Sequence, residues 1–359
     1  MKTNIKLLMS GSALALAVLG ATPVLAAGTA SGSTITNNVS VGYNVGGVAQ
    51  TAVNASNAIT VDRKINLTVA EVGSATTTVA PGQLAAVTTF TVTNTSNATL
   101  DFGLSVAEIA GGTAAHGGTD NFNAAAAPTV FVDANGNGTY EPLTDTATFM
   151  DEILADGVRT VFVVANIPAG QANASVAEVN LIAQARESGL VGTQGAVSAE
   201  TAGANTAGVD TVFADLAGTA AGDIARDGRH SDDDDYTVLG TVLSVAKQSR
   251  VISDPFNLLV NPKLIPGAIV EYCIVVTNPA GGGAADSVAI SDTLPAQTTA
   301  VVGFGPFLSG TYTGVVPTGT CNTDGISTPA ALVGNVVSGN LGTIAAGTSR
   351  TLYFRATIN

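Results

Sequence analysis

Strict alternation of apolar and polar residues is the feature that most constrains how this chain folds. Residues 39–45 place valine or tyrosine at every second position, and the segments 65–69, 89–93, 161–167 and 351–358 repeat this pattern. A period of two puts successive side chains on opposite faces of a strand. The pattern predicts an all-β chain of antiparallel sandwiches, in which each strand buries one face and shows the other to water.

The composition supports this fold class. The chain has 41 glycines, no tryptophan and only 11% charged residues. A coiled coil needs Glu, Lys and Leu in quantity, and a disordered chain has less apolar content than this one. Glycine-rich turns between β-branched segments are typical of all-β proteins.

One short helix interrupts the predicted strands. Asp145 suits a helix N-cap and Gly157 suits a helix end, and the apolar residues between them share one helical face. These apolar residues are Phe149, Met150, Ile153 and Leu154. We expect this helix to cover an edge or an end of the first sandwich.

The N-terminus has the pattern of a secretory signal peptide. Lys2 and Lys6 precede an apolar stretch, residues 7–18, and Val24-Leu25-Ala26 offers small residues at a cleavage site. We expect residues 1–26 to be removed, with no membrane span afterwards. The protein is then secreted, extracellular or bound to the bacterial cell surface. The formal net charge of −14 excludes nucleic acid as a main partner.

Two cysteines lie in the exported part of the chain, at Cys273 and Cys321. Cysteines of exported proteins usually pair, so we predict a disulfide between them. The alternative is two buried free thiols.

An internal repeat divides the chain. Pro81-Gly82 precedes a strand that ends at Asn94, and Pro266-Gly267 precedes a strand that ends at Asn278. We also pair the segment 167–170, before a strand at 179–185, with the segment 344–347, before the last strand. The repeat predicts two tandem immunoglobulin-like sandwiches, at residues 27–244 and 245–359. In the first, Gly111–Ala127 and residues 188–235 are expected to be long surface loops.

The second half resembles the bacterial conserved-repeat family known as domain of unknown function number eleven. The matching segments are Pro266-Gly267, Tyr272, Val275–Pro279, Gly281–Ala285, Val288–Pro295 and Gly342–Gly347. Residues 34–185 are more weakly similar, and their order of segments is also similar to camelysin-like biofilm fibre proteins. The resemblance implies immunoglobulin-like sandwiches in secreted or surface proteins and brings no enzymatic activity with it.

The best chemical motif is a calcium-loop pattern. Its ligands are Asp133, Asn135, Asn137, Glu141 and the carbonyl of Thr139, with Gly138 at the turn. Thr144 stands where such loops carry a bidentate glutamate, and Asp145 follows it. Both Asn-Gly pairs also suit a plain β-hairpin without an ion, so calcium and the bare hairpin remain two interpretations.

Other polar clusters carry weaker signals. The run Asp232–Asp235 is interpreted as a solvated loop, with weak cation binding as the alternative. His116 and His230 lie far apart in sequence and make a poor metal site. The exported part of the chain contains no Gly-x-Ser-x-Gly, His-Glu-x-x-His, Cys-x-x-Cys or phosphate-binding loop. We therefore predict no catalytic residues and no enzyme.

These features predict a non-enzymatic structural or adhesive protein, such as a subunit of a filament, surface layer or matrix. A calcium-dependent module that binds glycan or another ligand is the alternative. We expect self-association through the N-terminal strand Thr34–Val45, which could cover a sheet edge in its own subunit or in the next. The competing interpretation pairs this strand within its own domain, with Gly46-Gly47 as the hairpin turn and residues 48–53 as the return strand.

Overall fold

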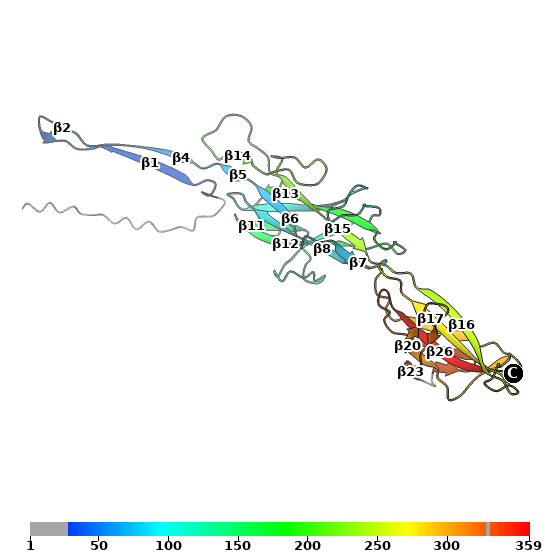
Figure 1. Ribbon diagram of the computed structural model, residues 1–359. Coiled ribbons are helices and arrows are strands. Elements are labelled where there is room, and N and C mark those ends of the chain that lie inside the picture. Colours follow the sequence, from blue (N-terminus) through cyan, green and yellow to red (C-terminus); the bar gives the residue numbers. More distant parts are fainter. Residues whose placement is uncertain (1–27, 328–330) are drawn as a thin grey trace, which may run out of the picture.

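The computed structural model describes residues 28–327 and 331–359, and the predicted signal peptide lies outside these residues. The described chain is all-β, as predicted, and contains no α-helix. Figure 1 shows three parts in chain order along one line: a projecting ribbon, a first sandwich and a second sandwich.

The ribbon is a solitary β-hairpin. Strand β1 (Thr34–Val41) pairs antiparallel with β4 (Val53–Thr60), and the short strands β2 (Asn44–Val45) and β3 (Val48–Ala49) close its tip. Gly46 and Gly47 form the turn with φ of 59° and 84°, values that favour glycine. The predicted turn is therefore confirmed, whereas the return strand, predicted at residues 48–53, lies mainly at Val53–Thr60.

The first sandwich consists of two facing sheets. Their strand orders are β10-β12-β8-β6 and β11-β9-β13-β15-β7, and a small parallel pair joins β5 and β14. The strands are β5 (Arg63–Ile65), β6 (Leu67–Glu71), β7 (Thr77–Val79), β8 (Ala86–Asn94), β9 (Leu100–Glu108), β10 (Thr129–Val132), β11 (Phe149–Ile153), β12 (Val158–Ala165), β13 (Val176–Glu187), β14 (Thr211–Phe213) and β15 (Arg229–Val238).

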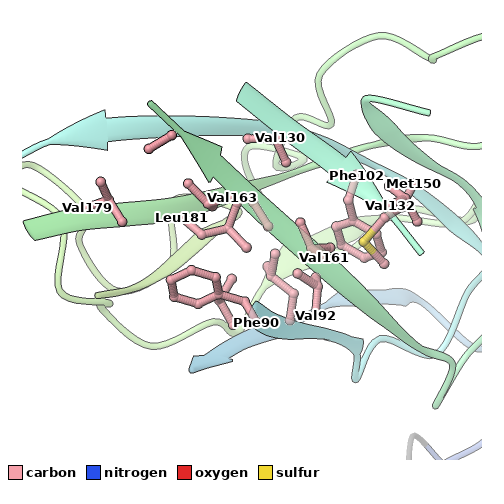
Figure 2. Packing of buried hydrophobic residues seen from close by; sticks show 14 of the residues in the cluster. Phe90, Val92, Phe102, Val130, Val132, Met150, Val161, Val163, Val179 and Leu181 are labelled. Carbon is pink, nitrogen blue, oxygen red and sulfur yellow. The ribbon is translucent and has the colours of Figure 1, made fainter. Parts of the chain in front are cut away.

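The core of this sandwich lies between the alternating faces that the sequence predicts. Phe90 on β8 and Val161 and Val163 on β12 are fully buried, and they face Phe102 and Leu181 of the opposite sheet (Figure 2). Burying each such side chain contributes about 1.5–3 kcal/mol.

The second sandwich follows a short connection, residues 239–243. Its larger sheet has the order β16-β17-β26-β20-β23, with β19 also on β26, and its smaller sheet has the order β18-β25-β24. The strands are β16 (Ser244–Ser253), β17 (Ile269–Thr277), β18 (Ala289–Thr293), β19 (Thr298–Ala300), β20 (Phe307–Gly310), β21 (Tyr312–Thr313), β22 (Thr320–Cys321), β23 (Ile326–Ser327), β24 (Leu332–Val333), β25 (Val336–Asn340) and β26 (Ser349–Ile358).

A disulfide fastens the outer face of the larger sheet. Cys273 on β17 and Cys321 on β22 are bonded, with their Cα atoms 5.7 Å apart, as predicted. The bridge packs with Val275 and Tyr353 in a small cluster of its own. Closing a loop of 48 residues stabilises the fold by about 4 kcal/mol in the chain-entropy model.

The two asparagines of the sequence repeat make equivalent hydrogen bonds in the two sandwiches. The side-chain amide of Asn94 donates to the carbonyls of Ala98 and Ile153 at 2.9 and 2.8 Å. That of Asn278 donates to the carbonyls of Gly283 and Ile344 at 2.8 and 2.7 Å. Both asparagines are fully buried, and each ties the end of a strand to carbonyls of two other segments.

This correspondence corrects one half of the predicted repeat. Because Asn94 bonds Ile153 as Asn278 bonds Ile344, the segment 344–347 corresponds to 153–156 and not to 167–170. The strand that follows it in the first sandwich is then β12, and its counterpart is β26. Both pair with the strand that carries the asparagine.

The predicted helix is wrong, because Phe149–Ile153 forms strand β11 on the edge of the five-stranded sheet. The ladder with β9 shifts register between Met150 and Ile153, and Glu152 has a φ of 50°. This bulge turns Met150 and Ile153, three positions apart, onto the same buried face. A bulged strand thus reproduces the spacing of an amphipathic helix.

Replacing the repeat asparagine should destabilise its own sandwich. Asn278→Ala leaves the Gly283 carbonyl unpaired and removes one of the two hydrogen bonds to the Ile344 carbonyl, so we expect the free energy of unfolding to fall by about 1–3 kcal/mol. Chemical denaturation followed by far-UV circular dichroism measures this change. The exposed Asn335→Ala should shift it by no more than about 0.5 kcal/mol. Equal small effects of both variants would contradict the role given to Asn278.

Candidate functional site

The ribbon has one apolar face and one polar face. The register places Ile35 opposite Ile59 and Val41 opposite Val53, while on the other face Asn38 is opposite Ser56. Val39 adds to the apolar face, which an Asn37–Asn57 pair interrupts. In a β-sandwich the apolar face of each sheet normally packs against the other sheet. In the ribbon this face is exposed, because all residues of β1 and β4 are exposed.

Each apolar side chain on this face is about half exposed to solvent. Ile35, Val39, Val41, Val53 and Ile59 keep 47–60% of their surface accessible. Within the described chain β1 pairs with β4 alone, so the outer edge of each strand also presents main-chain groups without a neighbouring strand. Contiguous apolar surface of this kind marks an interaction site.

The base of the ribbon is fixed to the first sandwich. Ser31 N donates to Asn97 O and Val61 N donates to Ser33 O, each at 2.9 Å. The buried Asn97 amide also donates to the carbonyls of Thr29 and Asp62. The ribbon therefore starts from a defined position, and Figure 1 shows it directed away from both sandwiches.

The predicted calcium loop lies between β10 and β11, which belong to different sheets, so the interpretation of this segment as a β-hairpin is wrong. The loop is built around two carboxylates. The Asp133 carboxylate accepts hydrogen bonds from Gly136 N and Gly138 N at 2.7 and 2.8 Å. The Asp145 carboxylate accepts from Ala134 N and Glu141 N and so closes the loop. Asp145 therefore caps this loop and does not cap a helix.

The loop brings some of the predicted ligands together. The Glu141 carboxylate accepts from the side-chain amides of Asn135 and Asn137 at 2.7 and 3.1 Å. The Asn137 side chain in turn accepts from Thr139 N at 2.8 Å. The side chains at loop positions 3, 5 and 9 therefore meet, with both asparagine amide nitrogens facing the Glu141 carboxylate and both amide oxygens bonded to the main chain.

The predicted loop 188–235 is only partly a loop, because Arg229–Val238 forms strand β15 between β13 and β7. Asp234 and Asp235, expected in solvent, are buried. The apolar alternation that signals a strand is missing here, since polar contacts hold these side chains. Asp232 accepts from Glu71 N at 2.8 Å, and Asp235 accepts from His116 N at 2.8 Å.

His116 belongs to a polar cluster that the sequence did not indicate, in which Asp234 is buried and Glu71 and His116 are partly exposed. Its Nε2 lies 3.2 Å from Asp234 Oδ1, and the ligand atoms of Glu71, His116 and Asp234 all lie within 4.8 Å of one another. In the described chain one further trio, Asp101, Asp151 and Glu152, converges in the same way. The loop 133–141 is not among these groups, and His230 stands apart, accepting from Val69 N at 3.1 Å.

Burial raises the pKa of two carboxyls, that of Asp234 in this cluster and that of Glu178 on the neighbouring strand β13. Burial, reinforced by a hydrogen bond and charge from Asp233, raises the pKa of Glu178 to about 7. Burial also raises the pKa of Asp234 to about 7, against an opposing contribution from the amide of Asp235. Both groups favour the neutral form in the folded protein.

These shifts predict that the first sandwich loses stability as the pH rises. Unfolded carboxyls titrate near pH 4, so between about pH 4 and 7 the folded state binds more protons than the unfolded state. The free energy of unfolding should therefore fall across this window, by at most about 1.4 kcal/mol per pH unit for each carboxyl. Urea denaturation at pH 5 and pH 8 measures it. Glu178→Gln should flatten the slope, whereas Asp286→Asn, on the second sandwich, should keep it.

Comparison with known proteins adds no identity. The sequence matches no protein-family profile and no curated protein, so the conserved-repeat resemblance stays a prediction. One similar solved structure is a membrane-anchored protein of Corynebacterium diphtheriae, 10% identical, covering 91% of this chain and 89% of that chain with a TM-score of 0.19. A TM-score this low does not indicate a shared fold. Across the described residues no helix is long and apolar enough to cross a membrane.

Proposed function

We propose that this protein is a non-enzymatic structural subunit of the cell surface or extracellular matrix, and that it assembles through its N-terminal ribbon. The observation that carries the proposal is the open apolar face of β1 and β4. An isolated two-stranded hairpin is marginally stable in water, so this ribbon needs a partner surface.

A second copy of the chain is the partner that fits. The ribbon, from Thr34 to Thr60, contains no charged residue, so it suits an apolar surface and not a charged ligand. The ribbon and the second sandwich lie at opposite ends of the described chain (Figure 1). A contact between one end and the other end of the next copy repeats without closing, and it produces a filament.

The sequence and the disulfide support export. Residues 1–26 have the pattern of a signal peptide, and the Cys273–Cys321 bridge suits an oxidising compartment. These two features together support a location outside the cell or on its surface.

Removing the ribbon tests the proposal. Thr34 and Thr60 are opposite each other at its base, so residues 35–59 are replaced by Asn-Gly, which forms a two-residue hairpin turn. We expect wild-type protein to form filaments in negative-stain electron microscopy and the ribbon-deleted protein to be monomeric in light scattering. Its melting temperature should stay within about 2 °C of the wild type, because neither core loses a residue.

Two single substitutions sharpen this test. Val39→Asp, on the apolar face, should weaken assembly at least tenfold, whereas Ser40→Asp, on the polar face next to it, should leave assembly close to wild type. Filaments that form equally well without the ribbon would refute the proposal, and so would a wild type that stays monomeric at every concentration.

A calcium ion in the loop 133–145 is the second proposal. The support is the convergence of Asn135, Asn137 and Glu141 around a turn that Asp133 organises. The ligands proposed are Asp133, Asn135, Asn137, Glu141 and the carbonyl of Thr139. Such an ion would stiffen the surface loop, and it would also serve the alternative function of calcium-dependent ligand binding.

Chelation tests the calcium site. An ion that binds only the folded state stabilises it by about 2.7 kcal/mol at a hundredfold excess over Kd, which raises the melting temperature by several degrees. We expect calcium to produce this rise and a chelator to reverse it. Glu141→Gln should reduce the rise, and it spares the backbone contacts of Asp133. An unchanged melting temperature would leave a loop without an ion, held by the Asp133 and Asp145 carboxylates.

A further inference from the structure

The four-stranded sheet of the first sandwich corresponds to four strands of the larger sheet of the second. The order β6-β8-β12-β10 in the first matches β16-β17-β26-β20 in the second, with the repeat asparagine ending β8 and following β17. The five-stranded sheet of the first sandwich and the smaller sheet of the second share one pairing, since β9 pairs with β11 as β18 pairs with β25. The two sandwiches are therefore the same arrangement up to this point.

The difference lies beside β9 and β18. In the first sandwich β13 pairs along the free side of β9, and β15 pairs with β13. Both strands come after β12 in the chain. In the second sandwich the counterpart of β12 is β26, and among the described residues no strand takes these two places. Among the described residues β18 pairs with β25 alone.

The vacant places leave an open apolar groove. It lies between β18 and β16, the edge strands of the two facing sheets. Its apolar lining is Leu243, Val245, Ile274, Val276, Val288 and Ile290. Val245 is 66% exposed, because no strand of the smaller sheet lies over it.

One ion pair crosses the mouth of this groove. Lys247 Nζ on β16 lies 2.6 Å from the Asp292 carboxylate on β18. Charged residues on sheet edges discourage pairing with unrelated strands. The ion pair thus disfavours pairing of these edges with unrelated strands, while the apolar side chains of the groove stay exposed.

We infer that this groove is the acceptor for the β1–β4 ribbon of the next copy of the chain. The inference rests on the function proposed above and names the partner surface. The ribbon takes the two places that β13 and β15 fill in the first sandwich, with one of its strands paired along β18. Its apolar face lies over Val245 and the neighbouring lining.

The fit rests on strand number, pattern and charge. Two antiparallel places are vacant, and the ribbon offers two antiparallel strands of eight residues each. Its apolar residues lie on one face, as the inner face of a sandwich strand requires, and β13 shows the same arrangement at Val179 and Leu181. An uncharged ribbon also meets no unpaired charge in the groove, because Lys247 and Asp292 neutralise each other.

A complementation experiment tests this acceptor. Val245→Glu blocks the groove but keeps the ribbon, and the ribbon-deleted protein keeps the groove. We expect each variant alone to be monomeric and an equimolar mixture to form a one-to-one heterodimer, measured by analytical ultracentrifugation. Val315→Glu, at a 77% exposed loop position of the same domain, is the matched control and should assemble like the wild type.

The outcomes separate this inference from the proposed function. If the Val245→Glu protein assembles with an affinity within threefold of wild type, the groove is not the acceptor. Assembly through the ribbon still stands in that case if the ribbon-deleted protein is monomeric. If the mixture fails to form heterodimers although both variants are folded by circular dichroism, the acceptor is also overturned. A wild type that is always monomeric, together with no heterodimer, refutes both.

Discussion

The pairing of strand edges is the constraint on which the rest of this structure depends. A β-strand satisfies its main-chain hydrogen bonds only when both sides have neighbours, so every sheet must end in strands that are covered, short or charged. The first sandwich meets this requirement with β13, β15 and the short β7. The second has two edges, β16 and β18, that face one opening with a single ion pair across it.

Much of the fold could be predicted from the sequence, because it depends on local patterns. The alternation of Phe90 and Val92, or of Val161 and Val163, identifies buried strand faces directly. Gly46-Gly47 identifies the turn, and the cysteine count identifies the bridge. The asparagines of the repeat could be located but not explained, since their partners Ile153 and Ile344 lie 59 and 66 positions away.

What the sequence could not reveal depends on contacts between distant segments. β11 has helical spacing because a bulge opposite β9 brings Met150 and Ile153 to one face. β15 has no apolar alternation because its aspartates are held by Glu71 and by His116, some 120 residues or more away in sequence. The groove beside β18 could not be predicted from the sequence either. It becomes apparent when the sheet that contains β9 and β13 is compared with the sheet that contains β18.

The energetics explain why both the ribbon face and the edge of β18 are needed for association. The ribbon exposes about half of each of five apolar side chains, and burying a whole one is worth about 1.5–3 kcal/mol, so covering this face contributes on the order of 5 kcal/mol. Association costs about 4–15 kcal/mol in lost freedom. Burial of the ribbon face alone falls short of this cost over most of the range, so burial of the groove lining, including Val245, and main-chain hydrogen bonds along β18 add to it. Because the base of the ribbon is already fixed by Asn97, less freedom is lost on binding, which favours assembly by this element over any mobile tail.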